Sequence, residues 1–574
     1  MIRRPESRWT VPPATDEAQT QLQVQGLVGA LGLPAPLCKL LVARGFADPD
    51  RAKRFLRPQL EHLHAPRLMR SMDVAVDRLA RAITGGELVM VHGDYDVDGM
   101  CSTTLMTRAI RALGGRAMPF IPDRQTDGYD LGSAGVAAAI AAGATVVLTC
   151  DCGTSARAPA DDLKAAGIDL IISDHHLPGG PLPDALAVLN PRRVDDASPD
   201  KDLAAVGVAF KLALELTRAL GGNENVVLNM LDLVALATVA DVAPLRGENR
   251  VYVRRGLALI KESKSPGIRA LIRSAGLDGK VITAGRIGFI LAPRLNALGR
   301  LDTALLGVEL LLAEREEEAN RIARHCEERN RERQEMDRRI LDEAIARVER
   351  MDLDATYGIV LSDERWHAGV IGIVASRIVE QTARPVFMIA VKDGIGKGSG
   401  RSIGAFDLHS ALTACSDLLI KHGGHRAAAG LTVAAERIPD FAARFNAVAL
   451  ERLKPEDLVK EVRMDLELPL AEATEELEKL LRHFEPFGIG NPGPLFLARG
   501  VRVASSVAKI GSDGVKLQVE SRERKIEAVG WGLAPRSGEL TEGAAVDIVY
   551  KLERNEYRGR STLQLGLVDF RRSA

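Results

Sequence analysis

Three aspartates at alternate positions follow an apolar, strand-like run in the first part of the chain. Asp94, Asp96 and Asp98 stand in HGDYDVDG, directly after ELVMV. In an extended segment alternate side chains point the same way, so the three carboxylates are expected to lie together. Like charges this close repel each other unless a cation lies among them or some are protonated. A single Asp-Gly pair would favour an ordinary turn or helix cap, but three alternating aspartates favour a cation site.

Two more polar clusters end strand-like runs further along the chain. Asp151 follows ATVVLTC, and Asp174, His175 and His176 follow DLIIS. Taken alone, His175 would more often be a structural histidine. However, the ligands of α/β sheets bind beyond the carboxyl ends of the strands, and all three clusters fall there. A metal site at this edge of the predicted sheet accounts for all of them.

The residue types in these clusters indicate which metal is bound. Carboxylates with one or two imidazoles and no obvious thiolate suit Mg²⁺ or Mn²⁺ better than zinc. Cys150 and Cys152 flank Asp151, but residues that alternate with a rim aspartate point away from it, so both are expected to be buried. The carboxylates outnumber those that one Mg²⁺ usually takes. Two ions about 3.5–4 Å apart that share Asp151 would use them and would stabilise the attacking and leaving oxygens of phosphate displacement.

Alternating strand-like and helix-like runs predict how the clusters are held. From Val74 the alternation is typical of an α/β domain with a mainly parallel sheet. One long helix is predicted over 314–350, as a solvated spacer between two α/β lobes. A tail of five short alternating runs matches an OB-type β-barrel. The predicted domains are an N-terminal, partly helical segment (1–73), a catalytic α/β domain (74–265), a connecting segment with the long helix (266–350), a second α/β domain (351–455) and an OB-type domain (456–574).

Overall charge does not indicate a nucleic-acid or membrane partner. The 574 residues carry 76 Lys and Arg against 77 Asp and Glu, a net charge of -1, so any such surface must be a local patch. Residues 499–574 carry 14 Lys and Arg against 10 Asp and Glu, a net charge of +4. A modestly basic small barrel suits single-stranded nucleic acid, although the same count fits an ordinary solvated surface.

The remaining composition indicates a cytoplasmic protein. No stretch approaches the run of about 20 apolar residues that a membrane-spanning helix needs. The basic N-terminus has no apolar core after it and is not read as a signal peptide. The 6 cysteines show no disulfide or zinc-finger spacing, which favours reduced thiols in the cytoplasm.

The motifs resemble those of a known family. HGDYDVDG, DCGTS, SDHH and ATVADVAPL are similar to the four ordered motifs of the DHH phosphoesterase family. APRLNALGR, WHAGVIGIVASR, GSGRS and GGHRAAAG resemble its bacterial single-strand-specific exonucleases, including their DHHA1 domain, and FGIGNPGPLF and the tail resemble their OB domain. The resemblance covers roughly residues 70–574. One departure is GYDLG at 128–132, where Asp130 stands at a position expected to be glycine.

This resemblance implies a processive exonuclease that degrades single-stranded DNA in the 5′→3′ direction to mononucleotides, in DNA recombination and repair. It implies two ions, Mn²⁺ or Mg²⁺, and a hydroxide nucleophile whose formation they favour. Asp241, inside DLVALATVADVAP, reads by spacing alone as an ordinary helix-end residue. The implied metal ligands are Asp94, Asp96, Asp98, Asp151, His175 and Asp241, and the implied catalytic residues are Asp98, Asp151, His175 and His176. Among them Asp151 would bridge the ions, and His176 would contact the scissile phosphate or help the leaving oxygen.

The second lobe lacks an acidic cluster and instead offers phosphate-binding groups. GSGRS provides backbone N–H groups, two hydroxyls and the guanidinium of Arg401. Each glycine-rich turn alone would be an ordinary strand-to-helix turn, and the resemblance is what assigns it to DNA. The residues so assigned are Arg124, Arg294, Asn296, Ser399, Arg401, Gly424 and His425.

Two other functions remain as alternatives. A DHH protein acting on small phosphates, a pyrophosphatase or an oligonucleotide phosphatase, would need only the two lobes, whereas the extra segments here favour a polymer substrate. A catalytically inactive scaffold would have an eroded acidic set, whereas every carboxylate and both histidines are present. The expected partners are single-stranded DNA, a DNA helicase and a single-strand-binding protein, because a narrow single-strand channel cannot admit a duplex. The chain is expected to be a monomer.

Overall fold

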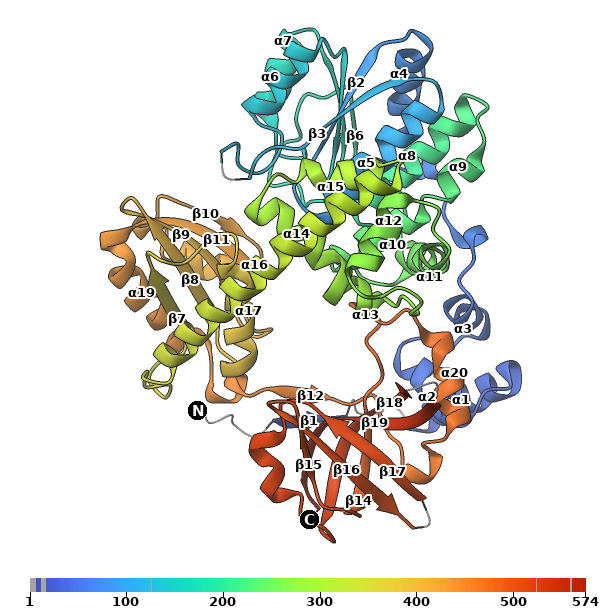
Figure 1. Cartoon of the computed structure of the whole chain (residues 1–574), viewed down its shortest axis with the longest axis vertical. Helices are drawn as coiled ribbons and strands as arrows, with labels where there is room; N and C mark the ends of the chain where they lie inside the picture. Colours follow the sequence, from blue (N-terminus) through green and yellow to red (C-terminus); the bar gives the residue numbers. More distant parts are fainter. Residues whose placement is uncertain (1–6, 12–16, 125, 523, 558–559, 574) are drawn as a thin grey trace.

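The computed structural model describes residues 7–11, 17–124, 126–522, 524–557 and 560–573. Two α/β lobes are joined by one long helix, and a β-barrel domain lies below them beside the first helices of the chain (Figure 1). Parts of the predicted N-terminal segment, residues 1–6 and 12–16, lie outside the described residues. The predicted fold class, two α/β lobes joined by a long helix and followed by an OB-type barrel, is confirmed.

The first lobe is built on a parallel sheet whose strand order is β3-β2-β4-β5-β6. The strands are Val- and Ile-rich and buried on both faces, as parallel strands between two helical layers are. The strands are β2 (Leu88–Gly93), β3 (Arg116–Phe120), β4 (Val146–Cys150), β5 (Asp169–Ser173) and β6 (Ala187–Leu189). Because β2, β4 and β5 are neighbours, their carboxyl ends bring the three polar clusters to one edge.

Helices cover both faces of this sheet and extend the lobe. Those between the strands are α4 (Met72–Thr84), α5 (Val97–Ala112), α6 (Ser133–Ala142) and α7 (Arg157–Ala165). Those after it are α8 (Ala205–Ala219), α9 (Glu224–Leu228), α10 (Leu231–Ala240), α11 (Gly247–Lys261), α12 (Pro266–Ser274), α13 (Ala284–Arg286), α14 (Ala292–Leu301) and α15 (Leu305–Leu312), with a π-helical segment at Ile287–Leu291. One continuous core runs from Met69 to Cys326.

The long helix α16 (Glu316–Val348) has 33 residues, so it spans about 50 Å. Near its start Ile322 and Cys326 are buried in the core of the first lobe, whereas Ile340 and Val348 belong to a separate core in the second lobe. The apolar stripe seen in the sequence is therefore shared between two cores. Polar residues occupy most of the helix between the two packed ends, which confirms the prediction of a spacer.

The second lobe contains a mixed sheet with strand order β10-β11-β9-β8-β7, in which only β7 and β8 are parallel. One face packs on α16 and α17, and the other packs on α18 and α19. The elements are β7 (Ile359–Asp363), α17 (Ile371–Thr382), β8 (Val386–Lys392), β9 (Ile395–Arg401), α18 (Leu408–Thr413), β10 (Lys421–Gly424), β11 (Ala428–Ala434) and α19 (Ile438–Arg452).

The C-terminal domain is a sheet with the order β13-β14-β18-β19-β17-β16-β15, and an additional β14–β16 pairing closes it into a barrel. The five predicted runs are confirmed as strands of this barrel. Its elements are β13 (Leu466–Glu467), α20 (Glu475–Leu481), β14 (Phe496–Val503), β15 (Ala508–Ile510), β16 (Gly514–Ser521), β17 (Arg524–Gly530), β18 (Ala545–Tyr557) and β19 (Arg560–Arg572).

The N-terminal helices belong to the barrel, which the sequence did not predict. They are α1 (Glu17–Leu31), α2 (Ala35–Ala43) and α3 (Pro49–Leu56). Their buried residues, Leu27, Leu40 and Phe55 among them, share one core with Phe496 and Tyr550 of the barrel. Strand β1 (Arg8–Thr10) also pairs in parallel with β12 (Glu461–Arg463), just before the barrel. The first and last segments of the chain therefore fold together.

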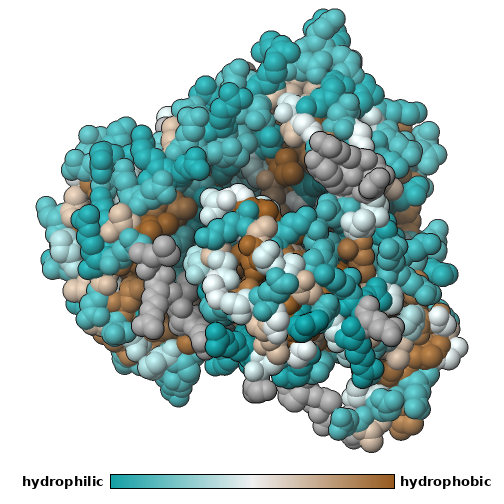
Figure 2. Space-filling view, turned by 60° about the horizontal axis from the view of Figure 1, so that its bottom comes forward, coloured by the Kyte–Doolittle hydropathy of each residue, from teal (hydrophilic) through white to brown (hydrophobic). Residues whose placement is uncertain are grey.

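The surface is mainly hydrophilic in the view of Figure 2, where apolar residues form scattered patches rather than one large face. Within the described part of the chain no single helix is long and apolar enough to cross a membrane. The bent pair α1 and α2, whose axes differ by 120°, meets that test only when both helices are counted together. All six cysteines are free and buried, as predicted for Cys150 and Cys152.

Candidate metal centre

The first acidic cluster lies in a strand-to-helix turn and not in an extended segment. Strand β2 ends at Gly93, and Asp96 is the N-cap of α5, where its Oδ1 accepts hydrogen bonds from the N–H groups of Asp98 (2.8 Å) and Gly99 (3.1 Å). The expectation of alternation in an extended segment is therefore wrong in its geometry. The turn still gathers the carboxylates. A Cβ at Gly99 would lie 2.3 Å from the Asp94 carbonyl oxygen, so only glycine fits at this approach.

Asp98 is buried and joins two helix N-termini. It lies in the first turn of α5, and its two carboxylate oxygens accept hydrogen bonds from the first N–H groups of α8, Ala205 (2.7 Å) and Val206 (2.9 Å). Burial and the neighbouring Asp96 carboxylate raise the pKa of Asp98 to about 7. Each carboxylate oxygen keeps a lone pair beyond these hydrogen bonds, so Asp98 can still bind a cation.

Asp151 follows β4 with a backbone φ of 70°, in the left-handed region that side chains other than glycine rarely adopt. This turn directs the carboxylate to the carboxyl edge of the sheet, where it is 2% exposed. Its Oδ1 is 3.2 Å from Nε2 of His175 and has no well-formed hydrogen bond within the described structure. Oδ1 of Asp94 is likewise buried without a hydrogen-bond partner there. Two buried, unsatisfied carboxylate oxygens indicate room for a cation.

His175 is held as a neutral ligand. Its Nδ1 is 3.1 Å from the Leu203 carbonyl oxygen, and the tautomer that donates this hydrogen bond leaves Nε2 unprotonated toward Asp151. Burial and the neighbouring His176 lower the pKa of His175 to about 4, so the imidazole is neutral at neutral pH. On its other side Nδ1 lies 3.8 Å from Oδ2 of Asp241.

His176 has the opposite charge preference although it is the next residue. Burial alone would lower its pKa, but a 2.7 Å hydrogen bond between its Nδ1 and Oδ1 of Asp174 raises the pKa to about 9. The Tyr129 hydroxyl lies 3.1 Å from its Nε2. A half-exposed imidazolium beside the metal ligands can therefore donate a proton or a hydrogen bond to a phosphate oxygen. The sequence assigned no role to Tyr129, and no motif feature singles it out.

Asp241 ends α10 and completes the cluster. Three groups of donor atoms, each within 4.8 Å of one another, could each hold an ion: Asp94, Asp96 and Asp151; Asp98, His175 and Asp241; and Asp151, His175 and His176. The groups overlap at Asp151 and His175. Oxygen-rich groups with one imidazole fit Mg²⁺ or Mn²⁺.

The electrostatics of the cluster favour divalent cations. Burial and repulsion by neighbouring carboxylates raise the pKa values of Asp94, Asp151 and Asp241 well above their usual range. Without a cation these groups would retain protons, and metal binding would release them. The chain therefore offers a site in which cations replace protons.

Asp130, the departure from the expected motif, supports the Asp151 turn. Its φ is 79°, in the region that favours glycine, which explains the expectation at this position. Its Oδ1 accepts hydrogen bonds from the N–H groups of Gly153 (2.6 Å) and Leu131 (2.8 Å). Gly153 itself has a φ of 106° in the loop after Asp151. The extra carboxylate of this chain therefore fastens the loop that carries Asp151.

Ser399 and Arg401 of the second lobe lie two residues apart on β9. The Arg401 guanidinium donates to the Gly400 carbonyl (2.8 Å) and to the Ser399 hydroxyl (3.1 Å), and no described carboxylate lies within ion-pair distance of it. A Cβ at Gly372 of α17 would come within 2.8 Å of Ser399 Oγ and 3.1 Å of an Arg401 nitrogen. A glycine is therefore needed where α17 passes these side chains.

Strand pairing brings the second glycine-rich motif beside Arg401. Gly424 pairs with Ala429, and Ala428 pairs with Arg401 across the sheet. His425 and Gly424 are exposed at this end of the sheet. The structure thus gathers Ser399, Arg401, Gly424 and His425 at one end of the mixed sheet, as expected if they share one phosphate.

The other predicted DNA contacts have structural partners. The Arg124 guanidinium lies over the ring of Tyr95, 4.7 Å from its centroid, beside the first acidic motif. Asn296 Oδ1 accepts a hydrogen bond from Val97 N–H (3.2 Å) and so fastens the start of α5. Arg294 forms an ion pair with Glu327 of α16 (2.6 Å).

Arg300 was missed by sequence reasoning, although it ends the quoted APRLNALGR motif. Its guanidinium donates to the Gly369 carbonyl of the second lobe (2.6 Å). Burial and the positive charges of Arg124, Arg333 and Arg401 lower its pKa to about 10, while Asp96 opposes this shift. Arg300 is therefore close enough to Asp96 in the first lobe and to Arg401 in the second to be influenced by both.

The fold and the site together define a DHH phosphoesterase. The models of three domain families match: the DHH family N-terminal domain over residues 88–238, the DHHA1 domain over 355–451 and the RecJ OB domain over 464–569. The single-stranded-DNA-specific exonuclease RecJ of Bacillus subtilis is 36% identical over 566 residues, which are 98% of this chain and 70% of that protein. RecJ of Escherichia coli is 36% identical over 93% of this chain and 95% of that protein.

Solved structures agree with these sequence matches. The crystal structure of RecJ from Thermus thermophilus in complex with Mn²⁺ superposes with a TM-score of 0.84 at 32% identity, and the match covers 99% of this chain and 80% of that one. The Mg²⁺ complex of the same protein gives a TM-score of 0.79. The chain belongs to the RecJ family.

Proposed function

We propose that this chain is a metal-dependent exonuclease that hydrolyses single-stranded DNA from its 5′ end and releases mononucleotides. The observation that carries the proposal is the set of three overlapping donor groups at the edge of the first lobe, which share Asp151 and His175. The RecJ relatives are described as single-stranded-DNA-specific exonucleases, and one of them binds Mn²⁺ or Mg²⁺. Two such ions, bridged by Asp151, are the cofactors that we assign.

The ions, when bound, would lower the pKa of water and neutralise charge on the phosphate. The residues of this chain then have separate tasks. Asp98, fixed by the first N–H groups of α8, and His175, fixed by the Leu203 carbonyl, keep their donor atoms in place. The imidazolium of His176, held by Asp174, donates to a phosphate oxygen or to the leaving oxygen. A pKa of about 9 keeps that proton available at neutral pH.

The end of the strand is read by the second lobe. The guanidinium of Arg401 and the hydroxyl of Ser399, 3.1 Å apart, form a cationic site with no competing carboxylate within ion-pair distance among the described residues. A planar guanidinium binds two phosphate oxygens at once. Gly424 and His425, at the same end of the sheet, would contribute N–H groups. We assign these residues to the terminal 5′-phosphate.

The proposed substrate implies other proteins. A site that takes single strands depends on a helicase to open duplexes and meets DNA coated by a single-strand-binding protein. We infer that the chain works as a monomer with these partners in recombination and repair.

End-labelled digestion tests this function. We expect 5′-labelled single strands to release labelled mononucleotide first, while a 3′ label persists in long fragments. Duplex DNA should resist digestion, and EDTA should stop the reaction until Mn²⁺ is restored. Release of the 3′ label first would contradict the proposed polarity, and equal rates on pyrophosphate would favour a small-phosphate hydrolase.

Arg401→Ala should remove most of the preference for a 5′-phosphate over a 5′-hydroxyl. Loss of charge-assisted hydrogen bonds of about 1.5–3 kcal/mol corresponds to a loss of roughly tenfold to a hundredfold in that preference. Arg401→Lys should restore it only in part, because lysine keeps the charge but not the two-pronged geometry. Initial rates on both substrates measure the effect. An unchanged preference in the alanine variant would place end recognition elsewhere, with Arg124 the next residue to test.

A further inference from the structure

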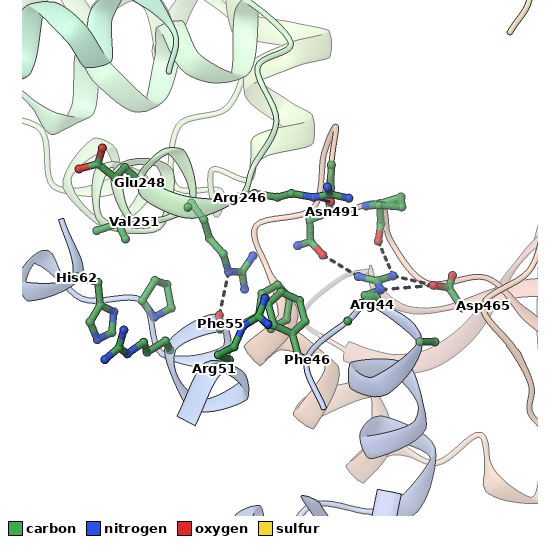
Figure 3. A pocket seen from close by; sticks show the side chains of 18 of the residues that line it. Arg44, Phe46, Arg51, Phe55, His62, Arg246, Glu248, Val251, Asp465 and Asn491 are labelled. Atoms are coloured by element: carbon green, nitrogen blue, oxygen red, sulfur yellow. Dashed lines mark hydrogen bonds and ion pairs between the residues drawn. The ribbon is translucent and has the colours of Figure 1, made fainter. Parts of the chain in front are cut away.

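A second cavity, of about 850 Å³, lies where the N-terminal helices, α11 and the barrel domain meet. Figure 3 shows it from close by: Phe46, Phe55 and Arg51 come from the N-terminal helices, Arg246 comes from the start of the α11 region, and Asp465 and Asn491 come from the barrel side. None of the motif residues assigned above lines it. Its size is within the range of small-molecule binding sites.

The walls of this cavity are strongly basic. Six arginines line it: Arg44, Arg51, Arg54, Arg246, Arg250 and Arg463. The acidic residues in the lining are already neutralised, because Glu248 pairs with Lys211 (2.7 Å) and Asp465 pairs with Arg44 (3.1 Å). Their charges are therefore not available to the other five arginines.

Those five guanidinium groups have no carboxylate within ion-pair distance in the described residues. Arg250 is buried and donates instead to the carbonyl oxygens of Phe55 (2.8 Å) and Phe484 (2.9 Å), and Arg246 donates to Gly490 (2.7 Å). Burial, together with the charges of Arg254 and Arg44, lowers the pKa of Arg250 to about 9. Arg51 and Arg54 are exposed on α3. The cavity thus holds an excess of positive charge that an anion would balance.

Aromatic rings adjoin these charges. Phe46 stacks on Phe55 with ring centroids 4.3 Å apart, and the Arg250 guanidinium lies 4.0 Å from the Phe55 centroid. Phe46 is only half-buried. Arginines beside an aromatic ring are the groups that bind a nucleotide, because they take its phosphate and stack on its base.

We propose that this cavity binds a phosphate-bearing nucleotide, with Arg51, Arg54 and Arg463 on the phosphate and Phe46 beside the base. The nucleotide is either a free mononucleotide or one unit of a bound strand. The cavity also adjoins the metal centre through the chain. Arg246 lies on the short loop after Asp241, and the N–H of Leu245 in that loop donates to Ile489 of the barrel side (2.7 Å). A nucleotide bound here contacts the loop that positions a metal ligand.

Binding in EDTA separates this cavity from the metal-dependent site. The probes are dAMP and an oligothymidylate of about 12 nucleotides with a 5′-hydroxyl, within the range bound by one OB fold. Full-length wild type, Arg51→Ala/Arg54→Ala and the control Arg81→Ala/Arg157→Ala are compared by titration calorimetry. The control removes two exposed arginines from α4 and α7, on the far side of the first lobe (Figure 1).

We expect the Arg51→Ala/Arg54→Ala variant to bind dAMP about tenfold or more weakly, and the control to match wild type. If dAMP displaces the oligonucleotide, the cavity holds a unit of the strand, and the variant's salt slope for the oligonucleotide falls by roughly 1.4. If dAMP binds without displacing it, the cavity takes free nucleotide. Unchanged binding of both probes in the variant would overturn the proposal. Mn²⁺-dependent digestion of short oligonucleotides should be the same in all three proteins, so this outcome is independent of the nuclease test.

Discussion

Asp151→Asn is expected to lower the rate of DNA cleavage by roughly a thousandfold or more while the protein stays folded. Asp151 belongs to two of the three donor groups, so replacing its charged oxygen weakens both ion sites at once. The loss of several kcal/mol of transition-state stabilisation corresponds to about three factors of ten. Asparagine also tolerates the left-handed φ of 70° at this position.

Thermal unfolding separates loss of metal from loss of fold in this variant. Burial and the nearby carboxylates raise the pKa of Asp151, so its charged form destabilises the metal-free protein at neutral pH. In EDTA the Asn variant should therefore unfold at the wild-type temperature or above. In Mn²⁺ only the wild type should gain stability.

Two further variants complete this experiment. Asp162→Asn, an exposed aspartate of α7, is the matched control and should change neither cleavage nor unfolding. Asp98→Asn should lose cleavage and also stability, because an amide cannot accept from both Ala205 and Val206 as the carboxylate does. Near wild-type turnover of Asp151→Asn at saturating Mn²⁺ would contradict the bridging role.

Removal of the barrel alone, residues 456–574, is expected to yield an aggregated protein. The barrel shares its core with α1, α2 and α3, so the deletion exposes Leu27, Leu40 and Phe55 among other buried side chains. Exposed apolar surface of this kind promotes association. Sequence motifs alone predicted that such a deletion would leave the chemistry intact, because every acidic motif precedes residue 242.

Removal of residues 1–58 together with 456–574 should instead leave a folded pair of lobes. The first-lobe core begins near Leu60 and does not include the barrel, and the second-lobe cores end by Leu458. This protein should cleave short oligonucleotides but bind long strands roughly a hundredfold more weakly, since two lost base-stacking contacts contribute about 1–3 kcal/mol each. Solubility, unfolding temperature and strand affinity are the measurements. A soluble single deletion with a wild-type unfolding temperature would show that the N-terminal helices do not need the barrel.

Residue types and their spacing were enough to predict the kind of chemistry and its place in the first lobe. Polar residues that end buried strands must meet at one edge, because parallel strands share one direction. That rule alone places Asp94, Asp151 and His175 together. The spacing of apolar residues likewise predicted α16, since a helix of this length needs a buried stripe at each end.

Contacts between segments that are distant in the chain depend instead on how the whole chain packs. Asp241 ends an ordinary helix, and its role depends on α10 lying beside the N-termini of α5 and α8, which no local pattern encodes. The opposite charges of His175 and His176 depend on Asp174 and on burial. The amphipathic faces of α1–α3 predict that something covers them but not that the barrel does. Periodicity specifies which side of an element is buried, whereas packing of the whole chain selects the partner.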